Sequence, residues 1–219
     1  VLVTGVDDRV FDAVVAPALE DMGATALRAG RDFRLVSERG SWRFEGRRWH
    51  LPELLLSLPG SFQADNAALA AATAEVLADQ GWPLHEADVR TGLASAVWAG
   101  RWQTVAQEPL IILDGGHNPG AAVRVAETLT HTPLPHPAVL VHASKPDKDH
   151  ATYLRLIAPF FDHVIETTMS GLADPALLAF EARNALRHRP GQAAAVVTIP
   201  DLGSAVHDAI RRAGTNGSV

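Results

Sequence analysis

Apolar residues recur with two different periods along this chain, and the changes of period divide it into segments. Residues 1–6 form a short β-rich run, and residues 8–22 place apolar side chains at helical spacing. Residues 26–51 mix aromatic side chains with charges and turn glycines, which predicts short antiparallel strands in a meander. Residues 63–80, rich in alanine, and residues 86–97 return to the helical period. The first part is therefore predicted to hold a βα unit, a small meander and two helices.

Beyond residue 100, apolar strand candidates alternate with helices. A strand over residues 101–105 opens this part, and we place a domain boundary near residues 98–100. Alternation of strands and helices is typical of a parallel, doubly wound α/β sheet. The strands that follow are expected at residues 110–113, 138–143, 163–167 and 195–199, and the helices near residues 120–131, 148–159, 174–188 and 202–213.

One of these strand ends carries a concentration of polar and turn-forming residues. Residues 110–113 are apolar and run into Asp114, and two glycines and His117 follow. Asn118 is expected to cap the next helix, with Pro119 in its first turn. A carboxylate at the carboxyl end of a parallel strand, beside a His and a helix N-terminus, lies where open α/β sheets bind nucleotides. This turn is therefore the first candidate for a functional site.

The composition narrows the class of protein. The chain has 219 residues, 47% of them hydrophobic and 20% charged, which suits one large globular domain or two small ones. A net charge of −6, with Lys145 and Lys148 as the only lysines, argues against a nonspecific nucleic-acid surface. The absence of cysteine excludes disulfides and thiolate metal sites. Because no signal peptide or membrane-spanning run is present, we expect a cytoplasmic protein.

Several familiar catalytic motifs are missing from this sequence. It contains no Gly-x-x-x-x-Gly-Lys-[Ser/Thr] P-loop, no Gly-x-Ser-x-Gly nucleophile elbow and no His-Glu-x-x-His metal helix. The histidines share no short ligand spacing, so no metal site is expected among these residues. Any phosphate chemistry would have to be completed by residues elsewhere.

Three polar features remain, and each has an ordinary structural interpretation beside the functional one. Asn66 stands near the head of the alanine-rich helix and is equally consistent with a residue of its N-terminal turn. Arg101 stands at the expected domain junction, where a solvated side chain is common. Asp114 is a natural cap for the turn that follows it, although loop residues at strand ends, His117 included, are often functional. Their order along the chain is more specific than any one of them.

This order resembles the folylpolyglutamate synthase/dihydrofolate synthase family, relatives of the Mur ligases. That family has a Gly-x-His-Gln-x-x-Asn-Ala helix start, a Pro-Gly-Arg-Leu/Phe-Glu junction and an Asp-Gly-Ala-His-Asn-Pro turn. Residues 60–67 here read Gly-Ser-Phe-Gln-Ala-Asp-Asn-Ala, residues 99–103 read Ala-Gly-Arg-Trp-Gln and residues 114–119 read Asp-Gly-Gly-His-Asn-Pro. Residues 147–149, Asp-Lys-Asp, resemble a further family motif, although solvated charges at a helix start are the simpler interpretation.

The resemblance implies a fold and a domain organisation. Residues 1–98 would be the C-terminal part of a Mur-ligase central ATPase domain, with the small antiparallel β segment. Residues 99–219 would be the Rossmann-like C-terminal glutamate ligase domain, with a mostly parallel sheet. The chain starts without Met, and the family's P-loop, Mg²⁺ ligands and modified lysine have no counterpart in it. We therefore expect a piece of a longer protein, inactive by itself.

The resemblance also implies roles for the matching residues. Asn66, Arg101 and Asp114 would bind ATP, with His117 close to the nucleotide, and Arg101 and His117 would take part in catalysis. The residue types suit these roles, because an amide can read the adenine edge, a guanidinium binds phosphate bidentately and a carboxylate accepts ribose hydroxyls. The departures from the family pattern are Phe62 for His, Ala99 for Pro, Gln103 for Glu and Gly116 for Ala.

The activity that the resemblance implies is ATP-dependent formation of an amide bond. With ATP and Mg²⁺, a carboxylate of folate or of its glutamate tail would be phosphorylated, and the amine of L-glutamate would attack the acyl phosphate. The acceptor would be tetrahydrofolate, dihydropteroate or both, and we expect a monomer without nucleic-acid or membrane partners. A Mur-type ligase acting on a cell-wall precursor and a noncatalytic nucleotide-binding module that lacks the P-loop half are the alternatives.

Overall fold

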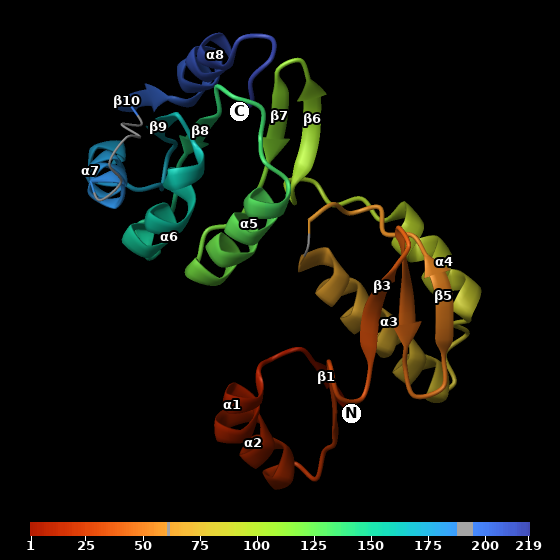
Figure 1. The fold of residues 1–219 in the computed structure, drawn as a ribbon. Coiled ribbons are helices and arrows are strands. Elements are labelled where there is room, and N and C mark those ends of the chain that lie inside the picture. Colours follow the sequence, from red (N-terminus) through yellow and green to blue (C-terminus); the bar gives the residue numbers. More distant parts are fainter. Residues whose placement is uncertain (61, 188–194) are drawn as a thin grey trace. The chain divides into compact units, whose positions relative to one another are not determined.

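The computed structural model describes residues 1–60, 62–187 and 195–219. It separates into two compact units, Val1–Trp98 and Ala99–Val219, which are described in turn (Figure 1). The first holds an antiparallel sheet and the second a parallel sheet, so the predicted α/β fold class is confirmed. No helix in the described part of the chain is long and apolar enough to cross a membrane.

The first unit begins with two parallel strands joined by a helical crossover. Strands β1 (Leu2–Thr4) and β2 (Ala26–Arg28) pair in parallel. Between them the chain forms α1 (Asp8–Val10), a π-helical turn (Phe11–Val15) and α2 (Ala16–Asp21). This is the βα unit expected at the start of the chain, with its second strand included.

Two details of the prediction for this region are wrong. The helix expected over residues 8–22 is not continuous, because Pro17 has no backbone N–H to donate to the carbonyl oxygen four residues earlier. The hydrogen bonds become π-helical at this point, and the Ala16 N–H donates to the Phe11 carbonyl oxygen five residues earlier. The strands within residues 26–51 are not all antiparallel either, because the crossover returns residues 26–28 alongside the first strand.

The antiparallel meander itself is confirmed over three strands. Strand β3 (Arg34–Glu38) pairs with β4 (Ser41–Glu45), which in turn pairs with β5 (His50–Leu54). Gly40 makes the tight turn between β3 and β4 with a φ of +89°, a conformation that favours glycine.

Two helices complete the core of the first unit. Helix α3 (Phe62–Asp79) packs against β3, and α4 (Glu86–Ser95) packs against β5. Small alanine side chains on α3 allow it to lie close to the sheet. The bounds differ by one or two residues from the prediction, and Ser61 of the predicted helix-start motif lies outside the described residues. The core residues are Leu27, Phe33, Phe44, Trp49, Leu51, Leu54, Ala68, Ala71, Ala72 and Val89.

Glu75 on α3 is a buried carboxylate that fixes the loop between β4 and β5. It is 2% exposed and accepts hydrogen bonds from three consecutive backbone N–H groups, at 3.2 Å from Arg47, from Arg48, and at 2.7 Å from Trp49. Backbone donors that lose their acceptor away from water destabilise a fold. This one side chain therefore ties helix to sheet.

We expect Glu75→Ala to lower the free energy of unfolding by about 3 kcal/mol, because three N–H groups lose a charged acceptor. Glu75→Gln keeps one acceptor oxygen and is expected to lower it by about 1–2 kcal/mol. Urea unfolding followed by tryptophan fluorescence measures both. The control is Glu20→Gln, at an exposed helical position, which is expected to change little. Equal stability of Glu75→Ala and the unmutated protein would contradict this interpretation.

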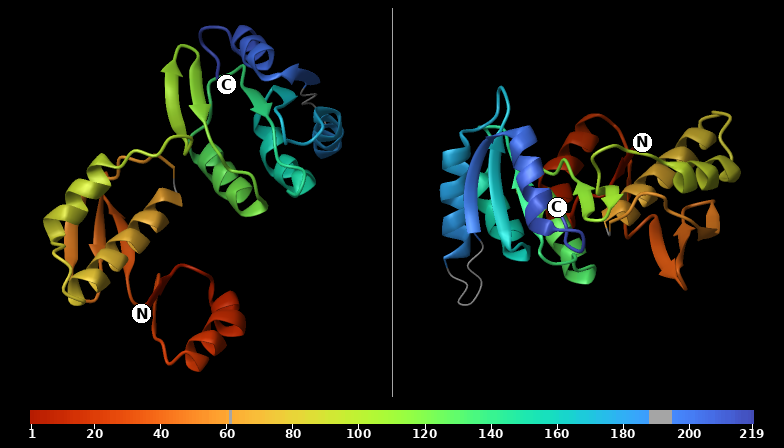
Figure 2. Two further views of the ribbon diagram at one scale, coloured as in Figure 1. Left: turned by 180° about the vertical axis from the view of Figure 1, so that it is seen from behind. Right: turned by 90° about the horizontal axis from the view of Figure 1, so that it is seen from above.

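A three-stranded parallel sheet forms the centre of the second unit. Its strands are β8 (Val139–His142), β9 (His163–Thr168) and β10 (Ala195–Asp201), in the spatial order β10-β9-β8. Three helices cover one face through the core around Val164, and one helix covers the other face through the core around Ile165 (Figure 2). The helices are α5 (Pro119–His131), α6 (His150–Ile157), α7 (Pro175–Leu186) on the first face and α8 (Leu202–Ala213) on the second.

The predicted alternation of strands and helices is thereby confirmed. The helix expected near residues 148–159 is shorter as an α-helix and ends in a 3₁₀ turn, Ala158–Phe160. The last residue of the helix expected near 174–188, His188, lies outside the described residues.

Strand β7 (Leu110–Leu113) departs from the predicted order. It pairs antiparallel with β6 (Gln103–Gln107), because only two residues separate the two strands. Residues 217–219 connect β7 with β8: the Leu110 N–H donates to the Gly217 oxygen at 3.1 Å, and the Val139 N–H donates to the Ser218 oxygen at 2.9 Å. Residue Ser218 pairs in parallel with both Leu110 and Ala138, and so links β7 to the parallel sheet.

Candidate functional site

The turn after β7 is organised by the carboxylate of Asp114. One oxygen, Oδ1, accepts a hydrogen bond from the Gly116 N–H at 2.7 Å, and the other, Oδ2, accepts one from the Trp102 N–H at 2.9 Å. The Gly115 N–H donates to the Gly100 carbonyl oxygen at 2.7 Å. The antiparallel pairing of β6 with β7 brings these two segments together, so the junction and the turn form one hydrogen-bonded unit.

Gly116 stands where a side chain would displace the carboxylate. A Cβ at this position would lie 2.7 Å from Asp114 Oδ1 and 3.1 Å from Ala121 Cβ. His117 follows, exposed, with its Nδ1 at 2.9 Å from the Gly115 carbonyl oxygen. Because a carbonyl oxygen only accepts, Nδ1 is the donor in this contact. Asp114 and His117 thus belong to one turn, and each makes a hydrogen bond to its backbone.

Asn118 caps helix α5, as expected. Its Oδ1 accepts a hydrogen bond from the Ala121 N–H at 2.8 Å, and Pro119 occupies the first helical position. The positive end of the helix therefore begins directly after the turn that holds Asp114 and His117. Such an end favours anionic groups nearby.

Arg101 lies on the same hydrogen-bonded unit as Asp114. It is half-buried and stands between Gly100 and Trp102, both of which are bonded to the Asp114 turn. Trp102 has a φ of +49°, an uncommon conformation for a residue with a side chain. The backbone of this junction is therefore held in a defined and strained conformation.

Asn66 belongs to the first unit, where it lies in the first two turns of α3. Its side chain is exposed and donates from Nδ2 to Gln63 Oε1 at 3.0 Å. The amide therefore has a local partner within the helix, in agreement with the structural interpretation, and its other atoms remain accessible.

Three buried polar residues behind the turn escaped the sequence analysis: His142 at the end of β8, Glu166 in β9 and Tyr153 on α6. Burial, with smaller contributions from the negative charges of Asp114 and Glu166, raises the pKa of Tyr153 to about 12. The sequence contains only a weak indication of these buried polar residues. Two polar residues interrupt apolar strands whose carboxyl ends lie at one edge of the sheet.

The Asp-Lys-Asp segment behaves as charges at a helix start. Asp149 caps α6 by accepting from the Thr152 N–H at 3.0 Å, and this hydrogen bond lowers the pKa of its carboxyl group. Lys148 Nζ donates to Asp147 at 2.8 Å, which lowers the pKa of Asp147. These contacts fit the simpler of the two interpretations of residues 147–149.

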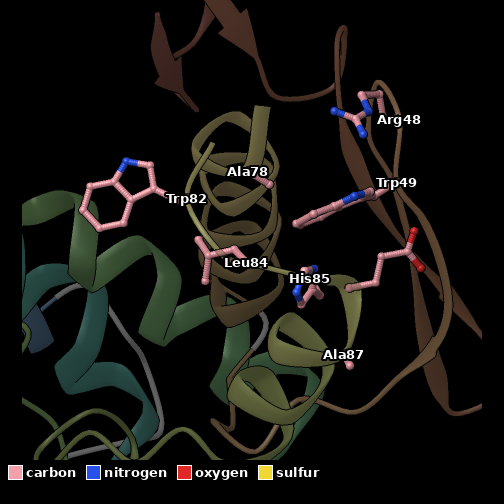
Figure 3. Close-up of a pocket in the computed structure, with 8 residues that line it drawn as sticks. Arg48, Trp49, Ala78, Trp82, Leu84, His85 and Ala87 are labelled. Carbon is pink, nitrogen blue, oxygen red and sulfur yellow. The ribbon is translucent and has the colours of Figure 1, made fainter. Parts of the chain in front are cut away.

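Over residues 1–60, 62–187 and 195–219, no three or more His, Asp or Glu side chains gather in a way that would hold a metal ion. A cavity of about 470 Å³ lies in the first unit, between the loop before β5 and the end of α3 (Figure 3). None of the predicted site residues lines it. Its lining residues are Arg48, Trp49, Ala78, Trp82, Leu84, His85, Glu86 and Ala87.

Comparison with known families identifies the second unit. Residues 100–219 match the family model described as Mur ligase, glutamate ligase domain, and this match covers more than half of the chain. The chain belongs to the Mur ligase family. Its Asp114 turn and its parallel sheet therefore lie within the part of the chain that matches the glutamate ligase domain of that family.

Within the Mur ligases, the chain is similar to individual folylpolyglutamate and dihydrofolate synthases. The folylpolyglutamate synthase of Lacticaseibacillus casei is 33% identical over 155 residues, 68% of this chain and 36% of that protein. The dihydrofolate synthase/folylpolyglutamate synthase of Escherichia coli is 29% identical over 157 residues, 72% of this chain and 36% of that protein. The structure of the folylpolyglutamate synthase of Mycobacterium tuberculosis complexed with ADP matches with a TM-score of 0.82 and 28% identity, over 96% of this chain and 47% of that one.

These matches confirm the resemblance to the folylpolyglutamate synthase/dihydrofolate synthase family, in its C-terminal portion. The chain spans between about a third and a half of the length of these relatives.

Proposed function

We propose that this chain is part of an ATP-dependent ligase that adds L-glutamate to folates, as a folylpolyglutamate synthase, a dihydrofolate synthase or both. The observation that carries the proposal is the hydrogen-bonded Asp114 turn, placed directly before the N-terminus of α5 in the part of the chain that matches the glutamate ligase domain. The names of the relatives, and the ADP in the mycobacterial structure, support the same reaction. In this proposal residues 1–98 are the end of the central ATPase domain.

The proposal gives each predicted site residue a role that suits the chemistry of its side chain. The Asp114 carboxylate accepts hydrogen bonds from the ribose hydroxyls of ATP, and the Asn66 amide reads the adenine edge. Arg101 binds the transferring phosphoryl group through its planar guanidinium. His117, which is exposed, lies beside the nucleotide.

The proposed reaction proceeds in two steps, transfer of a phosphoryl group and formation of an amide bond. A carboxylate oxygen of the folate or of its glutamate tail attacks the γ-phosphorus of ATP, and ADP leaves with the bridging oxygen. The amine of L-glutamate then attacks the acyl carbon, phosphate leaves with the former carboxylate oxygen, and the amine loses a proton. Arg101 offsets the negative charge that develops on the phosphoryl oxygens, where a fixed donor has its largest effect.

Over residues 1–60, 62–187 and 195–219, no group of three or more His, Asp or Glu side chains gathers that could hold a metal ion without further ligands. The Mg²⁺ of such a reaction is held by one or two protein side chains together with phosphate oxygens and water. We place the Mg²⁺ ligands and the phosphate-binding P-loop in a part of the protein outside this chain. Domain closure would then bring Arg101 to the nucleotide.

A glutamate-incorporation assay tests the proposal with the full-length protein that contains this chain. Labelled L-glutamate is expected to join tetrahydrofolate, dihydropteroate or both, only when ATP is present. Incorporation into a cell-wall precursor instead would favour the Mur-type alternative. Nucleotide binding without incorporation into any acceptor would favour the noncatalytic alternative, and both results would overturn the proposed function.

A further inference from the structure

Three buried polar side chains connect the parallel sheet to the Asp114 turn. We call His142, Tyr153 and Glu166 the buried polar cluster; their exposed fractions are 8%, 8% and 0%. His142 and Glu166 are register partners on adjacent strands, and Tyr153 comes from α6, which packs on α5. Polar groups remain in an interior when specific contacts compensate for the loss of water.

The contacts within the cluster are specific. His142 Nδ1 lies 2.8 Å from Glu166 Oε2, a hydrogen bond in which the imidazole donates to the carboxylate. The imidazole and the Tyr153 ring are stacked, with centroids 5.3 Å apart and planes inclined by 16°. The second oxygen, Glu166 Oε1, is buried and has no partner among the described residues. Glu166 therefore holds the imidazole, and the imidazole holds the tyrosine ring.

The far end of Tyr153 reaches the candidate site. Its hydroxyl lies 3.9 Å from the position that a Cβ on Gly116 would take, and the same position is 2.7 Å from Asp114 Oδ1. Gly116 is thus flanked by the Asp114 carboxylate and by the tyrosine. A tyrosine hydroxyl is neutral at physiological pH, and burial raises the pKa of Tyr153 further, to about 12, so this hydroxyl adds no negative charge beside Asp114.

We propose that Tyr153 is a positioning residue for Asp114, held in place by the His142–Glu166 pair. Tyr153, whose hydroxyl is the part given nearest to Gly116, limits the conformations that the turn and its carboxylate can adopt. This inference rests on the proposed nucleotide-binding role of Asp114. In this proposal, His142 and Glu166 on β8 and β9 hold Tyr153, and Tyr153 fixes the position of Asp114. These three side chains act on the site without contacting the nucleotide.

Two substitutions in the full-length protein separate positioning from packing. Tyr153→Leu removes the ring but keeps an apolar side chain in the core, whereas Tyr153→Phe keeps the ring and its stacking. The control is Leu178→Ala, which empties a fully buried position on α7 and destabilises the same unit. Each variant is compared by thermal unfolding and by its dissociation constants for ADP and for 2′-deoxy-ADP.

We expect Tyr153→Leu to weaken ADP binding about tenfold and to reduce the preference for ADP over 2′-deoxy-ADP, because a misplaced group loses most of its effect within about 1 Å. Tyr153→Phe keeps the stacked ring but removes the hydroxyl that lies nearest to Gly116, so a smaller loss of about threefold in both quantities is expected. Leu178→Ala should lower the thermal stability without changing the affinity for ADP or the preference for ADP over 2′-deoxy-ADP. Unchanged binding in Tyr153→Leu, or an equal loss in Leu178→Ala, would overturn the inference.

Failure of the proposed function is recognised separately. If the unmutated protein binds neither nucleotide, the proposed function is wrong, and hydrogen exchange of the Gly116 N–H still reports on the turn. That N–H donates to Asp114 Oδ1 and is expected to exchange about tenfold faster in Tyr153→Leu than in the unmutated protein, as local opening becomes more frequent. An unchanged exchange rate, or an equal increase in Leu178→Ala, would contradict a positioning role without reference to any ligand.

Discussion

Replacing Arg101 with alanine in the full-length protein is expected to lower the rate of glutamate ligation about 100-fold, because the transferring phosphoryl group loses a fixed cationic donor. The fold is expected to survive this change. The backbone on both sides is held by the bonds from the Gly115 N–H to the Gly100 oxygen and from the Trp102 N–H to Asp114, which a side-chain truncation leaves in place. The measurement is kcat beside the thermal unfolding midpoint of the same preparation.

Two further variants test whether the effect is specific to the guanidinium group of Arg101. Arg101→Lys keeps the positive charge but loses the planar, bidentate geometry, so an intermediate rate is expected. Arg155→Ala removes an exposed arginine from α6 and is expected to leave the rate unchanged. A rate in Arg101→Ala equal to that of the unmutated protein would exclude Arg101 from the site.

Asp114→Asn is expected to weaken ADP binding about 30-fold, which corresponds to about 2 kcal/mol for the loss of a charged acceptor. Both carboxylate oxygens accept backbone N–H groups, at 2.7 Å and 2.9 Å, and an amide offers only one acceptor oxygen. Its NH₂ group would face an N–H of the turn, so the turn itself would rearrange. Isothermal titration calorimetry with the full-length protein measures the change.

The control for Asp114→Asn is an aspartate in a comparable local role. Asp174 caps α7 by accepting from the Ala176 N–H, two residues on, at 2.8 Å, so Asp174→Asn makes the same chemical change at a carboxylate with a similar local hydrogen bond. It is expected to leave ADP binding unchanged. If Asp114→Asn bound ADP as tightly as the unmutated protein, the carboxylate would have no part in nucleotide recognition.

The sequence predicted the elements whose patterns are local. Apolar runs located β8, β9 and β10, and Asn118 with Pro119 located the start of α5, because a cap and a first-turn proline act within a few residues. The pairing of strands depends on distant partners, which periodicity does not identify. For this reason the parallel partner of β1 and the position of residues 217–219 beside β7 were not predicted.

The candidate site was predictable in part for the same reason. Asp114 and His117 lie three residues apart, so one turn holds both, and the local pattern was sufficient. The support behind them was not predictable, because His142, Tyr153 and Glu166 come from three different elements and meet only in the folded sheet. The roles given to Asn66, Arg101, Asp114 and His117 stay predictions, and so does the assignment of residues 1–98 to the central ATPase domain.

Transfer of an isotopically labelled oxygen tests the proposed ligase reaction most directly. Folate acceptor labelled in its carboxylate oxygens is incubated with the full-length protein, ATP and L-glutamate, and the released phosphate is examined by mass spectrometry. Phosphate carrying one labelled oxygen per glutamate added is expected, because the acyl phosphate passes a carboxylate oxygen to phosphorus. Glutamate addition with unlabelled phosphate would contradict the acyl phosphate, and the absence of any glutamate addition to a folate acceptor would contradict the proposed activity.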